Sequence, residues 1–285
     1  MRVWRNLRGL GCATLRDGVY VLPESPQNAS TLEQVAADVR SAQGTAEIFL
    51  LGAREEAQRP RLVALFDRRE EYAVLLSSIR AADVGDAKAR RALRRDFAAL
   101  SAIDFYPGEA RRQTEEALTA LEARANGEPA SVAGRIRRLA SADFQGRTWA
   151  TRKKLWVDRM ASSWLIARFI DRAPRFVWLA DPKRCPKKAL GFDFDGAAFS
   201  HVGGLVTFEV LAASFGLDTD PALARIAAIV HFLDVGGIPA PEAAGIEAVL
   251  AGARVTARND DELLLDAGRL FDNLYARYQL ENAHD

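Results

Sequence analysis

Two histidines and two carboxylates lie within one stretch of the chain and have the composition of a metal site. His231 and Asp234 are three residues apart in an expected helix, so both side chains can project to one side. His201 ends an expected strand, and Glu209 lies near the start of the next expected helix. Imidazole and carboxylate groups from three elements suit Zn, Fe or Mn, which makes these four residues candidate ligands of one divalent transition metal. The alternative is that His231 is a hydrogen-bonded, half-buried histidine and Glu209 a charge at a helix N-terminus.

A second candidate site lies where three cations gather at the start of an apolar helix. Arg152, Lys154 and Arg159 stand there beside two serines. Cationic side chains near the free N–H groups of a helix N-terminus form a good oxyanion site, and phosphate, sulfate and chromate all fit such a site. The alternative is the basic end of a linker, with Asp158 as an ion-pair partner at the helix start.

Other cations are spaced as they would be on helices that face DNA. The first set lies on one face of an expected N-terminal helix, and the second occupies little more than two turns of a later one. The candidate contacts to phosphate are Arg2, Arg5 and Arg8 in the first set and Lys88, Arg90, Arg91, Arg94 and Arg95 in the second. An ordinary solvated helix face is the alternative interpretation.

The distribution of charge also divides the chain. The formal net charge is +1, but residues 191–285 hold 5 Lys+Arg and 15 Asp+Glu, a balance of −10, which leaves +11 for the rest. Such a split suggests a part that faces nucleic acid or another anion and a part that does not. Intramolecular docking of opposite charges is the alternative, and a net charge near zero is unusual for a DNA-binding protein.

The elements that position these residues indicate an α+β protein. In the N-terminal part we expect a helix over residues 3–10, a strand over 18–22, a helix capped by Ser30 that runs to about residue 42, and a second strand over 46–51. This order fits an α+β sandwich that lacks its first strand. Residues 61–126 have a helical pattern throughout.

The C-terminal part is expected to be rich in helix with a few strands. We expect strands at 176–179, 192–194 and 198–200 and helices at 207–215, 221–233, 240–252 and 260–280. The predicted organisation is an N-terminal α+β domain (1–56), a helical segment (57–127), a linker (128–148) and a C-terminal domain (149–285).

Cysteine usage and hydropathy bear on the compartment. The two cysteines cannot form a disulfide framework, and no apolar run reaches the roughly 18 residues that a membrane span needs. We therefore expect a cytoplasmic protein with no membrane partner.

Taken together, the motifs resemble those of a known family. The block Lys154-x-x-x-Asp-Arg-x-x-x-x-Trp-Leu-Ile-x-Arg-Phe-Ile-Asp171, with Phe199-Ser-His201, Thr207-Phe-Glu209 and Ile229-Val-His-x-x-Asp234, resembles the chromate-resistance domain. The segments Met1-Arg-Val-Trp-Arg-x-Leu-Arg-x-Leu-Gly11 and Leu15-Arg-Asp-Gly-Val-Tyr-Val-Leu-Pro23 resemble the N-terminal domain of ChrB proteins. This chain departs from the family at two points. Members usually have an apolar strand before the first block, and this chain starts at that block, so a ferredoxin-like N-terminal unit would lack its first strand. Members also often have a cysteine shortly before Thr-Phe-Glu, where this chain has Val206.

The resemblance implies a chromate-responsive transcriptional regulator of a chromate-resistance operon. Promoter DNA and chromate or a related oxyanion are the expected partners, and a homodimer stays open. Two other functions also stay open: a metal-dependent enzyme of chromate or oxidative-stress detoxification, and a non-catalytic oxyanion-binding protein. Of these, a regulator is favoured over an enzyme.

Overall fold

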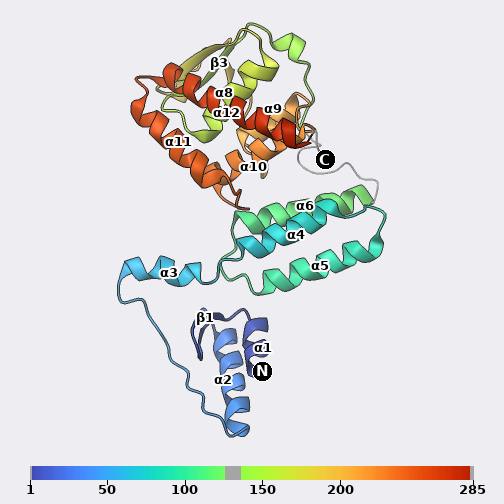
Figure 1. The fold of residues 1–285 in the computed structure, drawn as a ribbon, viewed down its shortest axis with the longest axis vertical. Coiled ribbons are helices and arrows are strands. Elements are labelled where there is room, and N and C mark those ends of the chain that lie inside the picture. Colours follow the sequence, from blue (N-terminus) through green and yellow to red (C-terminus); the bar gives the residue numbers. More distant parts are fainter. Residues whose placement is uncertain (1, 126–135, 283–285) are drawn as a thin grey trace.

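The chain is drawn out into three parts that follow one another in space as they do in sequence (Figure 1). The computed structural model describes residues 2–125 and 136–282. The N-terminal unit lies at one end, a group of helices in the centre, and the C-terminal domain at the other end. Among the described helices, none is long and apolar enough to cross a membrane.

The N-terminal unit consists of two helices and one hairpin. Helix α1 (Arg2–Gly9) precedes strands β1 (Ala13–Arg16) and β2 (Val19–Val21), which pair antiparallel, and helix α2 (Pro26–Ser41) follows. The first helix and the strand at 18–22 were predicted correctly, but the predicted cap of the second helix is wrong. Ser25 is the cap, because its side chain accepts a hydrogen bond from the backbone N–H of Asn28 at 3.1 Å and proline occupies the first turn.

The strand predicted at residues 46–51 is absent. This segment is an extended run without regular structure, and its large apolar side chains face solvent. Strand propensity alone does not make a strand, because a strand needs a neighbour to receive its backbone hydrogen bonds. The only described strands in this part of the chain, β1 and β2, pair with each other.

The central part is helical, as its apolar periodicity predicts. A short 3₁₀ turn (Glu56–Gln58) leads into α3 (Arg59–Ala64), α4 (Arg69–Ala81), α5 (Ala87–Ala102) and α6 (Glu109–Ala125). The last three helices pack around a small core made of Leu75, Ile79, Leu93, Leu118 and Leu121. Of the predicted linker, residues 128–135 lie outside the described residues, and the remainder includes a 3₁₀ turn at Ser141–Phe144.

The C-terminal domain places helices around a small parallel sheet. Its strands β3 (Thr148–Arg152), β4 (Arg175–Leu179) and β5 (Leu190–Gly191) have the order β4-β3-β5. Helix α8 (Val157–Leu165) continues as a π-helical turn (Ile166–Ile170), and a 3₁₀ turn (Pro182–Arg184) follows β4. The remaining helices are α9 (Thr207–Ser214), α10 (Pro221–Val235), α11 (Ala243–Thr256) and α12 (Asp260–Asn282).

These elements confirm the four predicted helices and the strand at 176–179, and the mixture confirms the α+β class. The strands predicted at 192–194 and 198–200 shrink to one isolated bridge between Phe192 and Phe199. One large core fills the domain, and Trp149 at its centre is fully buried. The Trp149 indole N–H donates to Asp171 at 3.0 Å, and this satisfies its polar atom.

Helix α6 rests directly on the C-terminal domain. Arg112 donates to the carbonyl of Gly204 at 3.3 Å, and Gln113 accepts from the backbone N–H of Ile238 at 2.9 Å. Gly237 has a φ of 98°, and a Cβ there would meet Glu109 and Gln113. The close approach of α6 therefore needs glycine at this position, and it brings Glu109 to the candidate site.

Candidate metal and oxyanion site

The site is organised by a buried aspartate in the first turn of α8. Asp158 is 2% exposed, and its two carboxylate oxygens accept the backbone N–H groups of Thr207 at 3.0 Å and Phe208 at 2.9 Å. These N–H groups open α9, whose N-cap residue Val206 has no side-chain acceptor. Asp158 thus caps α9 from another helix and fixes the two helices together.

His201 stands at the centre of three carboxylates. Its Nε2 atom lies 3.3 Å from Asp158 Oδ2, 3.6 Å from Asp193 Oδ1 and 3.5 Å from Asp234 Oδ2. The four side chains come from α8, from two loops before α9, and from the end of α10. The His201 side chain is 41% exposed, so the cluster opens to solvent.

The short distances between the carboxylates shift the pKa values of the groups in this cluster. Burial and the charges of Asp158 and Asp193 raise the pKa of Asp234 to about 6. Burial and the charge of Asp158 also raise the pKa of Asp193. The hydrogen bond with Asp158 raises the pKa of His201 despite the opposing effect of burial. The cluster therefore gains from an added positive charge, either a proton or a metal ion.

The donor set fits a first-row transition metal. One ligand atom from each of Asp158, Asp193 and His201 lies within 4.8 Å of the others. Metal–ligand bonds of about 2.1 Å place tetrahedral donors roughly 3.4 Å apart, close to the separations around His201 Nε2. Asp234 Oδ2 lies 3.5 Å from His201 Nε2, but Asp234 is not one of the three residues whose ligand atoms all lie within 4.8 Å of one another.

Two of the three predicted oxyanion-binding cations reach this cluster. Arg152 and Arg159 lie 3.4 and 3.6 Å from the same oxygen of Asp193. The Nε of Arg159 is buried and has no hydrogen-bond partner among the described residues, and burial lowers the pKa of this guanidinium. Lys154 does not join them, and its backbone N–H donates to Asp260 at 2.9 Å.

The other two predicted ligands form a separate group. His231 is 3% exposed, with Nδ1 2.8 Å from Glu209 Oε2 and Nε2 3.1 Å from Glu109 Oε1. Burial lowers the pKa of His231, but the hydrogen bonds and charges of the two glutamates outweigh it, so that the pKa is raised. Glu209 also accepts the backbone N–H of Val206 at 2.9 Å.

The four residues predicted as one metal site are thus divided into two pairs with different partners. The sequence interpretation placed Asp158 at a helix start but did not count it as a ligand, and it missed Asp193 and Glu109. The family-like block that contains Asp158 carried a signal for it. Asp193 has no informative spacing, and Glu109 lies outside the C-terminal part altogether.

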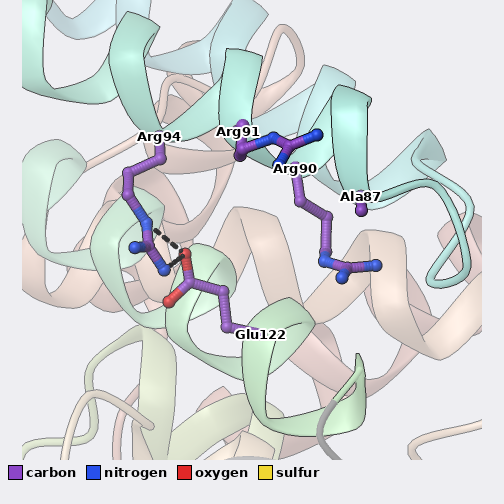
Figure 2. A pocket seen from close by; sticks show the side chains of 5 residues that line it. All are labelled: Ala87, Arg90, Arg91, Arg94 and Glu122. Atoms are coloured by element: carbon purple, nitrogen blue, oxygen red, sulfur yellow. Dashed lines mark hydrogen bonds and ion pairs between the residues drawn. The ribbon is translucent and has the colours of Figure 1, made fainter.

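The cations that are predicted to contact DNA differ in whether neighbouring groups already contact their side chains. Arg2 opens α1, Arg5 is exposed, and Arg8 lies over the ring of Trp4 at 5.2 Å. On α5, Arg90, Arg91 and Arg94 line a pocket together with Glu122 of α6 (Figure 2).

Within that pocket only part of the positive charge is unpaired. Figure 2 shows the guanidinium of Arg94 directed at Glu122, to which its Nε donates at 2.7 Å. Arg90 donates to the carbonyl of Val84. The side chains of Lys88, Arg91 and Arg95 have neither a hydrogen bond nor an ion pair within residues 2–125 and 136–282.

Comparison with known proteins covers nearly the whole chain. A family model described as the ChrB C-terminal domain matches residues 149–278, and one described as the ChrB N-terminal domain matches residues 1–91. Protein ChrB of Cupriavidus metallidurans is 47% identical over 291 residues, which cover 98% of this chain and 90% of that protein. No solved structure matches. The chain therefore belongs to the ChrB family, whose members are associated with chromate resistance.

Proposed function

We propose that this protein is a cytoplasmic, chromate-responsive transcriptional regulator. In this proposal, the basic faces of α1 and α5 contact promoter DNA, and the C-terminal cluster senses the oxyanion with the help of a bound metal. Family membership supports a role in chromate resistance, and the contacts between α6 and the C-terminal domain support a regulatory role.

The observation that carries the proposal is the contact between His231 and Glu109. Glu109 begins α6, and α6 packs against α5, where the side chains of Lys88, Arg91 and Arg95 have no ionic partner in the described part of the chain. A change at the C-terminal cluster has a continuous path through α10 and α6 to this basic face. An element that contacts both sites gives ligand binding a physical means to change DNA affinity.

In this proposal the C-terminal cluster holds a metal ion next to an oxyanion. We assign the metal to Asp158, Asp193, His201 and Asp234. His201 and Asp234 are ligands that the sequence predicts, whereas Asp158 and Asp193 take the place of Glu209 and His231. A bound divalent metal would supply positive charge beside Asp193 and weaken its hold on Arg152 and Arg159. The released guanidinium groups, above all that of the half-buried Arg159, suit the tetrahedral oxygens of chromate.

The test is promoter binding measured against salt, with and without chromate. A fluorescent duplex that spans the promoter of a chromate-resistance operon should bind at low salt and lose affinity as salt rises. Chromate at fixed ionic strength should change that affinity, whereas an equal concentration of sodium chloride should not. Absence of promoter binding at low salt, or binding that is indifferent to chromate, would contradict the regulator.

One observation favours a second candidate, a metal-dependent enzyme of chromate detoxification. His201 is accessible to solvent, and the pKa of Asp234 is raised to about 6, which are properties of groups that transfer protons. The distinguishing measurement is the disappearance of chromate in the presence of the metal-loaded protein and a supplied reductant. Turnover that the Asp193→Asn variant loses would favour the enzyme over the regulator.

A further inference from the structure

The N-terminal unit leaves an apolar, strand-like segment in solvent. Residues 46–51 have the sequence Ala-Glu-Ile-Phe-Leu-Leu and an extended backbone, and they run along the outside of the molecule between α2 and α3 (Figure 1). The exposed fractions of Ile48, Phe49, Leu50 and Leu51 are 44, 76, 76 and 65%. We call this segment the arm. Consecutive apolar residues of this kind are typical of a strand that is covered on both faces.

The same unit carries an open sheet edge. Strands β1 and β2 form a sheet of two strands only, so each has one edge without a partner strand among the described residues. β1 ends in Arg16, a charged residue of the type that protects an edge, whereas β2 is Val-Tyr-Val. A two-stranded hairpin is marginal in water, and the core beneath this one is small: Leu7, Cys12 and Val35 are buried, with Leu10, Tyr20, Leu22 and Leu32 partly buried against them.

The arm is a strand-like segment without a partner, β2 has an open edge that can receive a strand, and each copy of the chain has both. We propose that two copies exchange arms, so that residues 46–51 of one copy add a strand to β2 of the other. The exchange is self-complementary about a twofold axis, because the arm of each copy meets the hairpin of its partner. It supplies the missing backbone partners of the arm and the hairpin at the same time.

Exposed apolar side chains are concentrated in the N-terminal unit, where the proposed exchange takes place, and their area is sufficient for a dimer interface. Eight of the seventeen exposed large hydrophobic side chains of the described residues lie within the first 51 positions. They are Val3, Trp4, Leu15, Val19 and the four arm residues. The arm exposes on the order of 500 Å² in each copy, so a reciprocal exchange removes on the order of 1,000 Å², which is about the lower limit for a biological interface.

The first test is the oligomeric state of the full-length protein, measured by sedimentation over a wide range of concentrations. We expect a dimer that the Phe49→Asp/Leu51→Asp variant converts to a monomer with an unchanged far-ultraviolet circular dichroism spectrum. Leu265→Asp on α12 is the matched control, because Leu265 is 67% exposed and lies in the C-terminal domain. A monomeric wild-type protein, or a dimer that survives the arm substitutions, would overturn the proposal.

The second test asks whether the arm pairs between copies or within one. In a Cys185→Ser background, one chain carries Val19→Cys and another, of different mass, carries Leu50→Cys. Oxidation of the mixture should give a disulfide that joins the two chains. If the Val19→Cys/Leu50→Cys double variant forms its disulfide within a single chain instead, the arm folds back on its own hairpin and the exchange is wrong. Neither test involves DNA or chromate, so the result is independent of the proposed function.

Discussion

His231 on α10 and Glu109 on α6 join two parts of the protein through one partly buried contact, with Nε2 3.1 Å from Oε1. The other ring nitrogen is held by Glu209 at 2.8 Å. A neutral imidazole can donate from only one nitrogen, whereas both nitrogens face carboxylates here. The protonated ring satisfies both, so the attachment of α6 to the C-terminal domain depends on the charge of His231.

We expect this charge to make stability depend on pH. Removal of one partner from a buried ion pair costs on the order of 3 kcal/mol, so His231→Gln should lower the free energy of unfolding by about this amount near pH 6. Because the pKa of His231 is raised in the folded state, this stabilisation is fully present below the unfolded value of about 6.5 and is lost as pH rises through the folded pKa. Urea unfolding near pH 6 and near pH 9 measures the difference.

The control for this prediction is Glu109→Gln, which keeps an acceptor for His231 but removes the charge. It should destabilise less than His231→Gln and should flatten the pH dependence. Equal losses for His231→Gln at both pH values would mean that the ring is neutral in the folded protein.

The outcome for the N-terminal elements shows where sequence reasoning succeeds and where it fails. Periodicity located the first helix, because an amphipathic helix depends on its own residues and one apolar face. The arm at residues 46–51 has equally good strand character, yet it is not a strand, because pairing depends on a partner outside the segment. The cap at Ser25 was missed in favour of Ser30, although the proline that follows Ser25 marks the stronger helix start.

The candidate site shows the same limit. His201 and Asp234 were identified from residue type, and the structure brings them within 3.5 Å of each other. Their partner Asp193 comes from a loop in which it has a φ of 55°, and no local pattern marks such a position. Glu109 belongs to a helix more than a hundred residues away from His231, so only the docking of α6 brings them together.

The division of the predicted ligands into two groups changes what metal analysis should find. The geometry predicts that Asp193→Asn and His201→Ala abolish stoichiometric metal in protein purified without added metal, because both remove a donor from the cluster. His231→Ala should keep its metal, since His231 belongs to the other group. Metal content measured by mass spectrometry decides between them, and loss of metal in His231→Ala alone would restore the original assignment of His231.

Metal affinity should also fall as the solution becomes more acidic. Binding requires the deprotonated forms of Asp234, whose pKa is about 6, and His201, whose pKa is raised. Protons therefore compete more strongly as pH falls through this range, and zinc affinity should be weaker near pH 5.5 than near pH 8. Calorimetric titration at the two pH values checks the sign, and an affinity that does not change would exclude these groups as ligands.

Metal and chromate should bind cooperatively if Asp193 links them. A cation on Asp193 weakens its ion pairs with Arg152 and Arg159 and frees both for an oxyanion. Chromate affinity should rise several-fold when zinc is present, and zinc affinity should rise by the same factor with chromate. Arg159→Ala should weaken chromate binding and leave zinc binding in place. Lys154→Ala is the matched control, because among the described residues the Lys154 side chain has no ion pair with the cluster. Equal chromate affinity with and without zinc would show that Asp193 does not couple the two binding sites.

The unequal pairing of the α5 arginines gives the sharpest test of the DNA interface. Arg91 has no ionic partner among the described residues, whereas Arg94 is paired with Glu122 at 2.7 Å. A free cation that meets phosphate releases counterions, so Arg91→Gln should reduce the slope of log affinity against log salt by about one unit. Arg94→Gln should reduce the slope less, because Glu122 already cancels much of that charge.

Glu122→Gln should make the slope steeper, since it leaves Arg94 unpaired and available to phosphate, and promoter affinity at low salt should rise. Fluorescence anisotropy against salt concentration for the three variants gives the slopes. If all three match the wild type, α5 does not face DNA, and the exposed Arg5 on α1 becomes the remaining candidate for the interface.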